Sequence, residues 1–159
     1  MPNPRVEAML KTAQEKLSSA AHLITVTYPL IKDKKMFSRA LVLLAESIES
    51  GINASLLHAH YTEGLQITKK SDLDYQIWKQ NRKKYDISSE ELKAIDEIKF
   101  IGKRLKNSAM EFTRQDSLVI LEESLEHSQI NERRLREFLS IVRGVLLKIK
   151  SKHESNESF

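Results

Sequence analysis

Apolar side chains recur at spacings of three and four along most of this chain, which is the period of an amphipathic α-helix. The first such run extends from Val6 to Ile24 and follows Asn3 and Pro4, which suit the cap and the first position of a helix. We expect this helix to stop near Tyr28, because the residue before a proline is driven out of the helical conformation.

A second apolar run, Phe37 to Leu56, follows a polar break at residues 32–35 and precedes Gly64, a suitable helix terminator. The sequence therefore predicts two long helices that lie antiparallel as a hairpin. Small residues in the second helix would let a neighbouring helix approach closely; they are Ala45, Gly51, Ala54 and Ser55.

Three shorter signals predict the remaining helices. Ser71 or Asp72 can cap a third helix that reaches about Lys84, with Trp78 as an apolar anchor. The Ser88 and Glu91 pair reads as a capping box that opens a fourth helix to about residue 107. Asn131 can cap the last helix, whose apolar stripe from 135 to 149 is wider than one contact seam requires. Such a helix is central to a bundle or shared with a second subunit.

Residues 109–130 fit two interpretations. Their alternating and β-branched apolar residues favour a small β-hairpin, although Leu118, Leu121 and Leu125 also fit a helical period. We favour the hairpin. The predicted fold is then a mainly α protein: an antiparallel bundle of four to five helices in one domain, residues 1–150, followed by a disordered polar tail, residues 151–159.

Composition narrows the class of protein. The chain has 159 residues, 40% of them hydrophobic, with four glycines and no cysteine. These numbers exclude a disulfide framework, a thiolate metal site and a glycine-rich phosphate loop. No stretch has the uninterrupted apolar length of a signal peptide or a membrane span, so we expect a cytoplasmic protein with no membrane partner.

The net charge of +4 is unevenly distributed. Residues 64–114 carry twelve Lys and Arg against eight Asp and Glu, whereas the flanking segments are close to neutral. If two middle helices share a face, their cations could bind RNA, DNA or another polyanion. The candidate anion-binding residues are Lys79, Arg82, Lys83, Lys84, Lys99, Lys103, Arg104 and Lys106.

Catalytic and metal-binding patterns are weak. His58 and His60 are two residues apart and would point to different sides of a helix, while Glu123 and His127 could share a face only in a helix. Glu46 and Glu49 lie beside the stripe of the second helix, where a solvated flank is the simplest interpretation. We expect no cofactor and no metal, and we favour a protein that is not an enzyme.

Several stretches resemble small uncharacterised archaeal proteins. They are Ala21-His22-Leu23-Ile24-Thr25-Val26-Thr27-Tyr28-Pro29-Leu30, Lys32-Asp33-Lys34-Lys35, Met110-Glu111-Phe112-Thr113-Arg114 and Leu118-Val119-Ile120. The resemblance implies a long helical hairpin, shorter helices, a hairpin-like segment and a final helix, and it brings no activity. Length and helical layout are also similar, more distantly, to the HEPN family of helical bundles. None of the five histidines follows an arginine by four to six residues, as the nuclease members of that family require.

The sequence thus favours a non-catalytic helical interaction module that self-associates or binds a protein partner. The wide stripe of the last helix supplies the candidate self-association residues Phe138, Ile141, Val145 and Ile149. Polyanion binding through the middle third is the alternative, and HEPN-type catalysis is the least favoured hypothesis.

Overall fold

The computed structural model describes residues 3–33, 35–68, 70–111 and 131–157. Within them the chain forms α1 (Pro4–His22), a π-helical turn (Leu23–Thr27), α2 (Tyr28–Ile31), α3 (Lys35–Glu63), α4 (Ser71–Gln80), a 3-10 turn (Arg82–Tyr85), α5 (Ser89–Glu111) and α7 (Glu132–Glu157). The predicted helical bundle is confirmed, and the described residues contain no strand.

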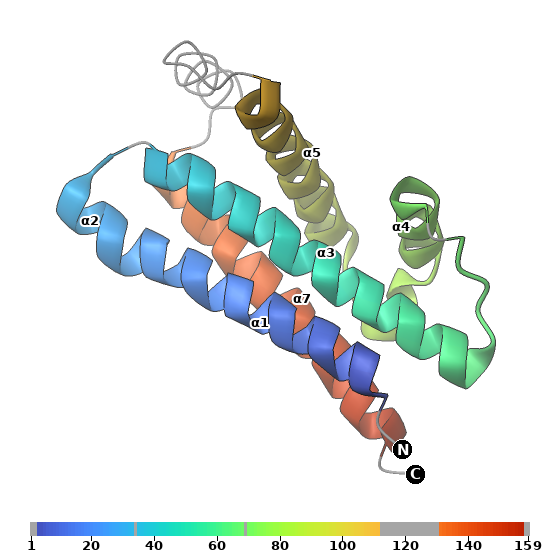
Figure 1. The fold of residues 1–159 in the computed structure, drawn as a ribbon. Helices are drawn as coiled ribbons and strands as arrows, with labels where there is room; N and C mark the ends of the chain where they lie inside the picture. Colours follow the sequence, from blue (N-terminus) through green and yellow to red (C-terminus); the bar gives the residue numbers. More distant parts are fainter. Residues whose placement is uncertain (1–2, 34, 69, 112–130, 158–159) are drawn as a thin grey trace.

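Helix α3 lies at the centre of the bundle, packed against α1, α5 and α7 (Figure 1). Helices α1 and α3 form the expected antiparallel hairpin, and the two ends of the chain lie side by side (Figure 1). The largest fully buried side chains include Trp78, Phe138 and Leu44. Length and composition alone would also allow α3 to cross a membrane, but the central helix of a bundle passes the same test.

Small residues on α3 and α5 bring the helices close together. A Cβ atom added at Gly51 would collide with the side chain of Leu146 on α7, and one added at Gly102 would collide with the Cβ of Ala45. The absence of a side chain at Gly51 lets α7 pack closely against α3 in the core. The absence of a side chain at Gly102 lets α5 pack closely against α3, so the backbones of these two helices form the bottom of a surface groove.

Three predicted caps are confirmed, whereas the cap expected at Ser71 or Asp72 is wrong, because both residues lie inside α4 and its N-cap, Lys70, makes no side-chain capping bond. The Asn3 side chain accepts from the backbone N–H of Arg5, and the Asn131 side chain accepts from that of Arg134, at 2.9 Å in each case. Ser88 and Glu91 form the reciprocal capping box, with distances of 3.0 and 3.1 Å. Gly64 follows α3 with φ +71°, a left-handed conformation that glycine adopts without strain.

The predicted stop before Pro29 is wrong. The helix instead widens into the π-helical turn and continues through Pro29 at the start of α2. It ends at Lys32, whose φ of 55° is left-handed. Because proline has no N–H, the shift to π-helical hydrogen bonding reduces the cost of placing it within a continuous helix. Thr25 also donates its hydroxyl to the carbonyl of Ala21, at 2.7 Å.

Two further expectations need correction or comment. Residues 151–157, expected as a disordered tail, continue α7, because His153 is buried and ties this end of the helix to α3. Residues 109–111 of the expected β-hairpin belong to α5, and residues 112–130 lie outside the described part of the chain.

Candidate functional site

An open groove of about 340 Å³ runs between α3 and α5, with α4 at one end. Val42, Ala45 and Gly102 contribute its apolar floor, which exists because Gly102 allows the two helices to approach. Phe100 stands on the α5 side with 61% of its surface exposed. We call this feature the α3–α5 groove; its other lining residues are Glu46, Glu49, Ser71, Asp72, Lys99, Lys103 and Lys106.

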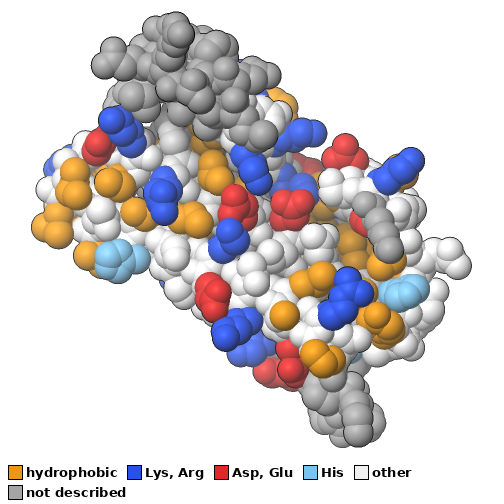
Figure 2. All heavy atoms as spheres, viewed as in Figure 1, with side chains coloured by type: hydrophobic (Ala, Val, Ile, Leu, Met, Phe, Trp, Pro, Cys, Tyr) orange, Lys and Arg blue, Asp and Glu red, His pale blue; other side chains and the backbone are white. Residues whose placement is uncertain are grey.

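The two walls of the α3–α5 groove carry opposite charges. Helix α3 supplies the carboxylates of Glu46 and Glu49, and α5 supplies three ammonium groups. Acidic and basic side chains alternate over the region between these helices (Figure 2). With Asp72 from α4, the groove holds three acidic and three basic side chains. Its formal charge is therefore zero.

Only part of this charge is neutralised within the groove. Glu46 forms an ion pair with Lys16 and lies 3.8 Å from the Nζ of Lys106. Among the described residues, Glu49, Asp72 and Lys103 have no oppositely charged atom within 4.0 Å. These three side chains are exposed and can therefore pair with charges on another molecule.

Lys99 is the most constrained cation of the groove. Its ammonium lies 4.1 Å from the ring centroid of Tyr75, whose hydroxyl donates to Asp96 at 2.6 Å. Burial lowers the pKa of Lys99, and this effect outweighs the attraction of the nearby carboxylates. Burial, with a smaller contribution from the Asp96 hydrogen bond, raises the pKa of Tyr75. The fold thus keeps Lys99 in the groove although burial makes its protonated form less stable than it is in water.

Some side chains of the predicted basic cluster form ion pairs or hydrogen bonds within the protein, and others are exposed to solvent. Lys79 pairs with Asp96 at 2.9 Å and Lys84 with Glu63 at 2.8 Å, while Arg82 donates to the carbonyl of Ile87 at 2.7 Å. Lys79 and Lys99 both lie over the Tyr75 ring, so α4 and α5 do approach each other there. Lys83, Lys103 and Arg104 are exposed, and Lys99, Lys103 and Lys106 line the groove.

The predicted self-association residues lie inside the protein. Phe138, Val145 and Ile149 are at most 1% exposed, and the half-buried Ile141 packs against the same core. The stripe of α7 is wide because this helix faces α1, α3 and α5 at once. It therefore offers no apolar surface to a second subunit through these residues.

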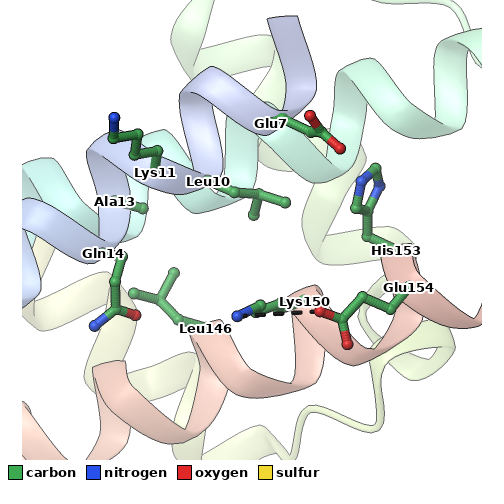
Figure 3. A pocket seen from close by; sticks show the side chains of 9 residues that line it. All are labelled: Glu7, Leu10, Lys11, Ala13, Gln14, Leu146, Lys150, His153 and Glu154. Atoms are coloured by element: carbon green, nitrogen blue, oxygen red, sulfur yellow. Dashed lines mark ion pairs between the residues drawn. The ribbon is translucent and has the colours of Figure 1, made fainter. Parts of the chain in front are cut away.

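A second groove, of about 330 Å³, separates α1 from α7 (Figure 3). Leu10, Ala13 and Leu146 line its apolar part, and Lys150 forms an ion pair with Glu154 at 4.0 Å on one wall. At one end, His153 lies with its Nδ1 atom 3.1 Å from that of His58 on α3. The described residues contain no group of three or more potential metal ligands.

Sequence reasoning missed Phe100, which sits at the edge of the predicted stripe of α5. The buried stripe contains Ile98, Ile101 and Leu105, all at most 5% exposed. Phe100 falls outside that helical spacing, and a large aromatic residue on the polar side of an amphipathic helix is the signal that could have identified it. Glu49 is exposed and Glu46 partly exposed, as expected for a solvated flank, and the structure adds that both lie on a groove wall.

Comparisons with family models, with curated proteins and with solved structures found no match to this chain.

Proposed function

We propose that this protein is a non-catalytic interaction module that binds a protein partner in the α3–α5 groove. The observation that carries the proposal is the combination, in one groove, of an exposed aromatic side chain with charges of both signs that have no ion-pair partner among the described residues. Interfaces gain most of their affinity from a few anchors of this kind, with a polar rim around them.

The apolar contribution comes from Phe100 and the groove floor. An exposed phenylalanine leaves apolar surface in water, and covering it with a partner recovers about 25 cal/mol for each Å². The floor at Val42, Ala45 and Gly102 offers a shallow apolar strip beside it. An amphipathic helix laid along this strip would cover both features.

The charges favour a partner that carries both signs. Lys103 on one wall suits a carboxylate, and Glu49 on the opposite wall suits a cation. Lys99, which is held in the groove against the cost of burial, adds a third site of attraction. Charged groups kept at a cost to stability are typical of functional surfaces.

The proposal is tested by comparing two substitutions of equally exposed apolar residues. Phe100 and Leu147 are 61% and 60% exposed, but Leu147 lies on α7 and does not line the groove. We expect a protein captured by the wild type to be retained by Leu147→Ser and reduced at least about tenfold by Phe100→Ser. Equal capture by both variants, with both folded by circular dichroism, would contradict the proposal.

Polyanion binding is the alternative, supported by the adjacent exposed cations Lys103 and Arg104 on α5. It predicts that single-stranded RNA or duplex DNA binds at low salt, with affinity that falls steeply as salt rises. Reversing Lys103 and Lys106 to glutamate should then weaken binding by about tenfold or more. Nucleic-acid affinity that is unchanged by these reversals would exclude this alternative.

A further inference from the structure

We infer that the partner which the α3–α5 groove accepts is a second copy of this chain, related to the first by a two-fold axis parallel to the groove. The inference rests on the proposed function and specifies its partner. It is carried by the arrangement of charge on the groove walls, acidic on α3 and basic on α5.

A groove with one acidic and one basic wall is complementary to itself in one orientation. When two copies face each other across an axis parallel to the groove, α3 of each copy lies against α5 of the other. Acidic walls then meet basic walls on both sides of the axis, as a closed two-fold interface requires. An axis across the groove would instead place like charges together.

The levels of the charged residues along the groove agree with this orientation. Ala45 packs at the level of Gly102, and Glu49 lies close enough to Lys99 to attract it, so α3 and α5 run in opposite directions along the groove (Figure 1). A parallel two-fold axis keeps each residue at its own level. Lys103 of one copy therefore faces residues 42–46 of the second copy, where Glu46 is the carboxylate within reach of a long side chain, while Glu49 faces Lys99.

The apolar residues and the charge balance support the same arrangement. In this dimer, Phe100 on the α5 wall of one copy lies against the α3 wall of the second copy. Val42 and Ala45 there are partly buried apolar residues. Three acidic and three basic side chains cancel within each groove, so two copies do not repel each other. A groove of one sign would oppose its own copy by like-charge repulsion.

A charge-exchange experiment tests the inference, with mass measured by sedimentation velocity over a range of concentrations. We expect a wild-type dimer whose dissociation constant rises at least about tenfold in Lys103→Glu and in Glu46→Lys, because each variant places like charges on facing walls. Mixing the two variants restores opposite charges on both sides of the axis, so the mixture should form a heterodimer with affinity near that of the wild type.

Arg143→Glu is the matched control, since Arg143 is exposed on α7 and does not line the groove. It should leave the dimer intact. A wild-type monomer at every concentration, a dimer insensitive to both groove variants, or a mixture that does not recover would each overturn the inference. The proposed function is judged separately: if the wild type is monomeric but Phe100→Ser still loses another captured protein, the groove binds that partner instead.

Discussion

The side chain of Lys99 is partly buried, and this burial reduces the stability of the folded protein at neutral pH. Its stem is covered by neighbouring residues and its ammonium rests on the Tyr75 ring, yet burial still lowers its pKa. The attraction of Glu49, Asp72 and Asp96 therefore recovers only part of the hydration that the ammonium loses on folding. A neutral side chain of similar shape would avoid this loss.

We predict that Lys99→Met raises the midpoint of thermal unfolding at neutral pH by roughly 1–3 °C. The pKa of Lys99 is lower in the folded than in the unfolded chain, so wild-type stability rises with pH once the folded lysine begins to lose its proton. The advantage of the variant should therefore shrink under alkaline conditions. Calorimetry at neutral and alkaline pH measures both effects, and a variant less stable than the wild type at neutral pH would show that the attractions dominate.

The helices are positioned by glycines whose roles differ according to what faces them. At Gly51 an added methyl group would meet the end of the Leu146 side chain, which can rotate away. At Gly102 it would meet the Cβ of Ala45, which moves only with the backbone of α3. At Gly144 nothing lies within 4 Å. One substitution, glycine to alanine, thus has three different consequences in one bundle.

We predict that Gly102→Ala destabilises the protein by about 1–3 kcal/mol, because α3 and α5 must separate to admit the methyl group. Gly144→Ala, the matched control within a helix, should instead stabilise it by up to about 1 kcal/mol through its higher helix propensity. Urea unfolding of both variants measures the difference. Equal effects of the two substitutions would contradict the close approach that forms the groove floor.

Local signals predicted the beginnings and the ends of helices to different degrees. Caps such as Asn3, Ser88 and Asn131 act through neighbouring backbone amides, so the sequence alone identified them. The helix end predicted before Pro29 was wrong. Proline cannot donate the α-helical backbone hydrogen bond, but a π-helical turn just before it shifts the hydrogen-bond register and lets the helix continue. Whether an apolar stripe faces a core or a partner depends on distant helices, and this is why Phe138 was assigned to a surface.

The groove was predicted only in its parts. The spacing of Lys99, Lys103 and Lys106 placed them on one side of α5, as observed. Periodicity could not show that Glu49 faces them, because that pairing depends on the packing of α3 against α5. The functional proposals therefore depend on tertiary structure, although every residue that they use belongs to a regular helix.

At the end of the bundle where the two chain termini lie side by side (Figure 1), a buried pair of imidazoles joins α3 to α7. His58 on α3 and His153 on α7 are 9% and 6% exposed, with their rings in edge contact and their Nδ1 atoms 3.1 Å apart. One ring donates an N–H to the other, so this contact anchors the last turns of α7 to the centre of the molecule. The sequence suggested a disordered tail because the residues around His153 are polar.

We predict that His153→Ala lowers the free energy of unfolding by about 2 kcal/mol, from a lost buried hydrogen bond and the cavity left behind. Amide hydrogen exchange should accelerate first in residues 150–157, since that end of α7 loses its anchor. Ser151→Ala, on the exposed side of the same turn, should change neither property appreciably. If His58→Ala and the double variant lose about as much as His153→Ala alone, the two histidines act as one unit. Additive losses would instead mean that each ring is held by its own surroundings.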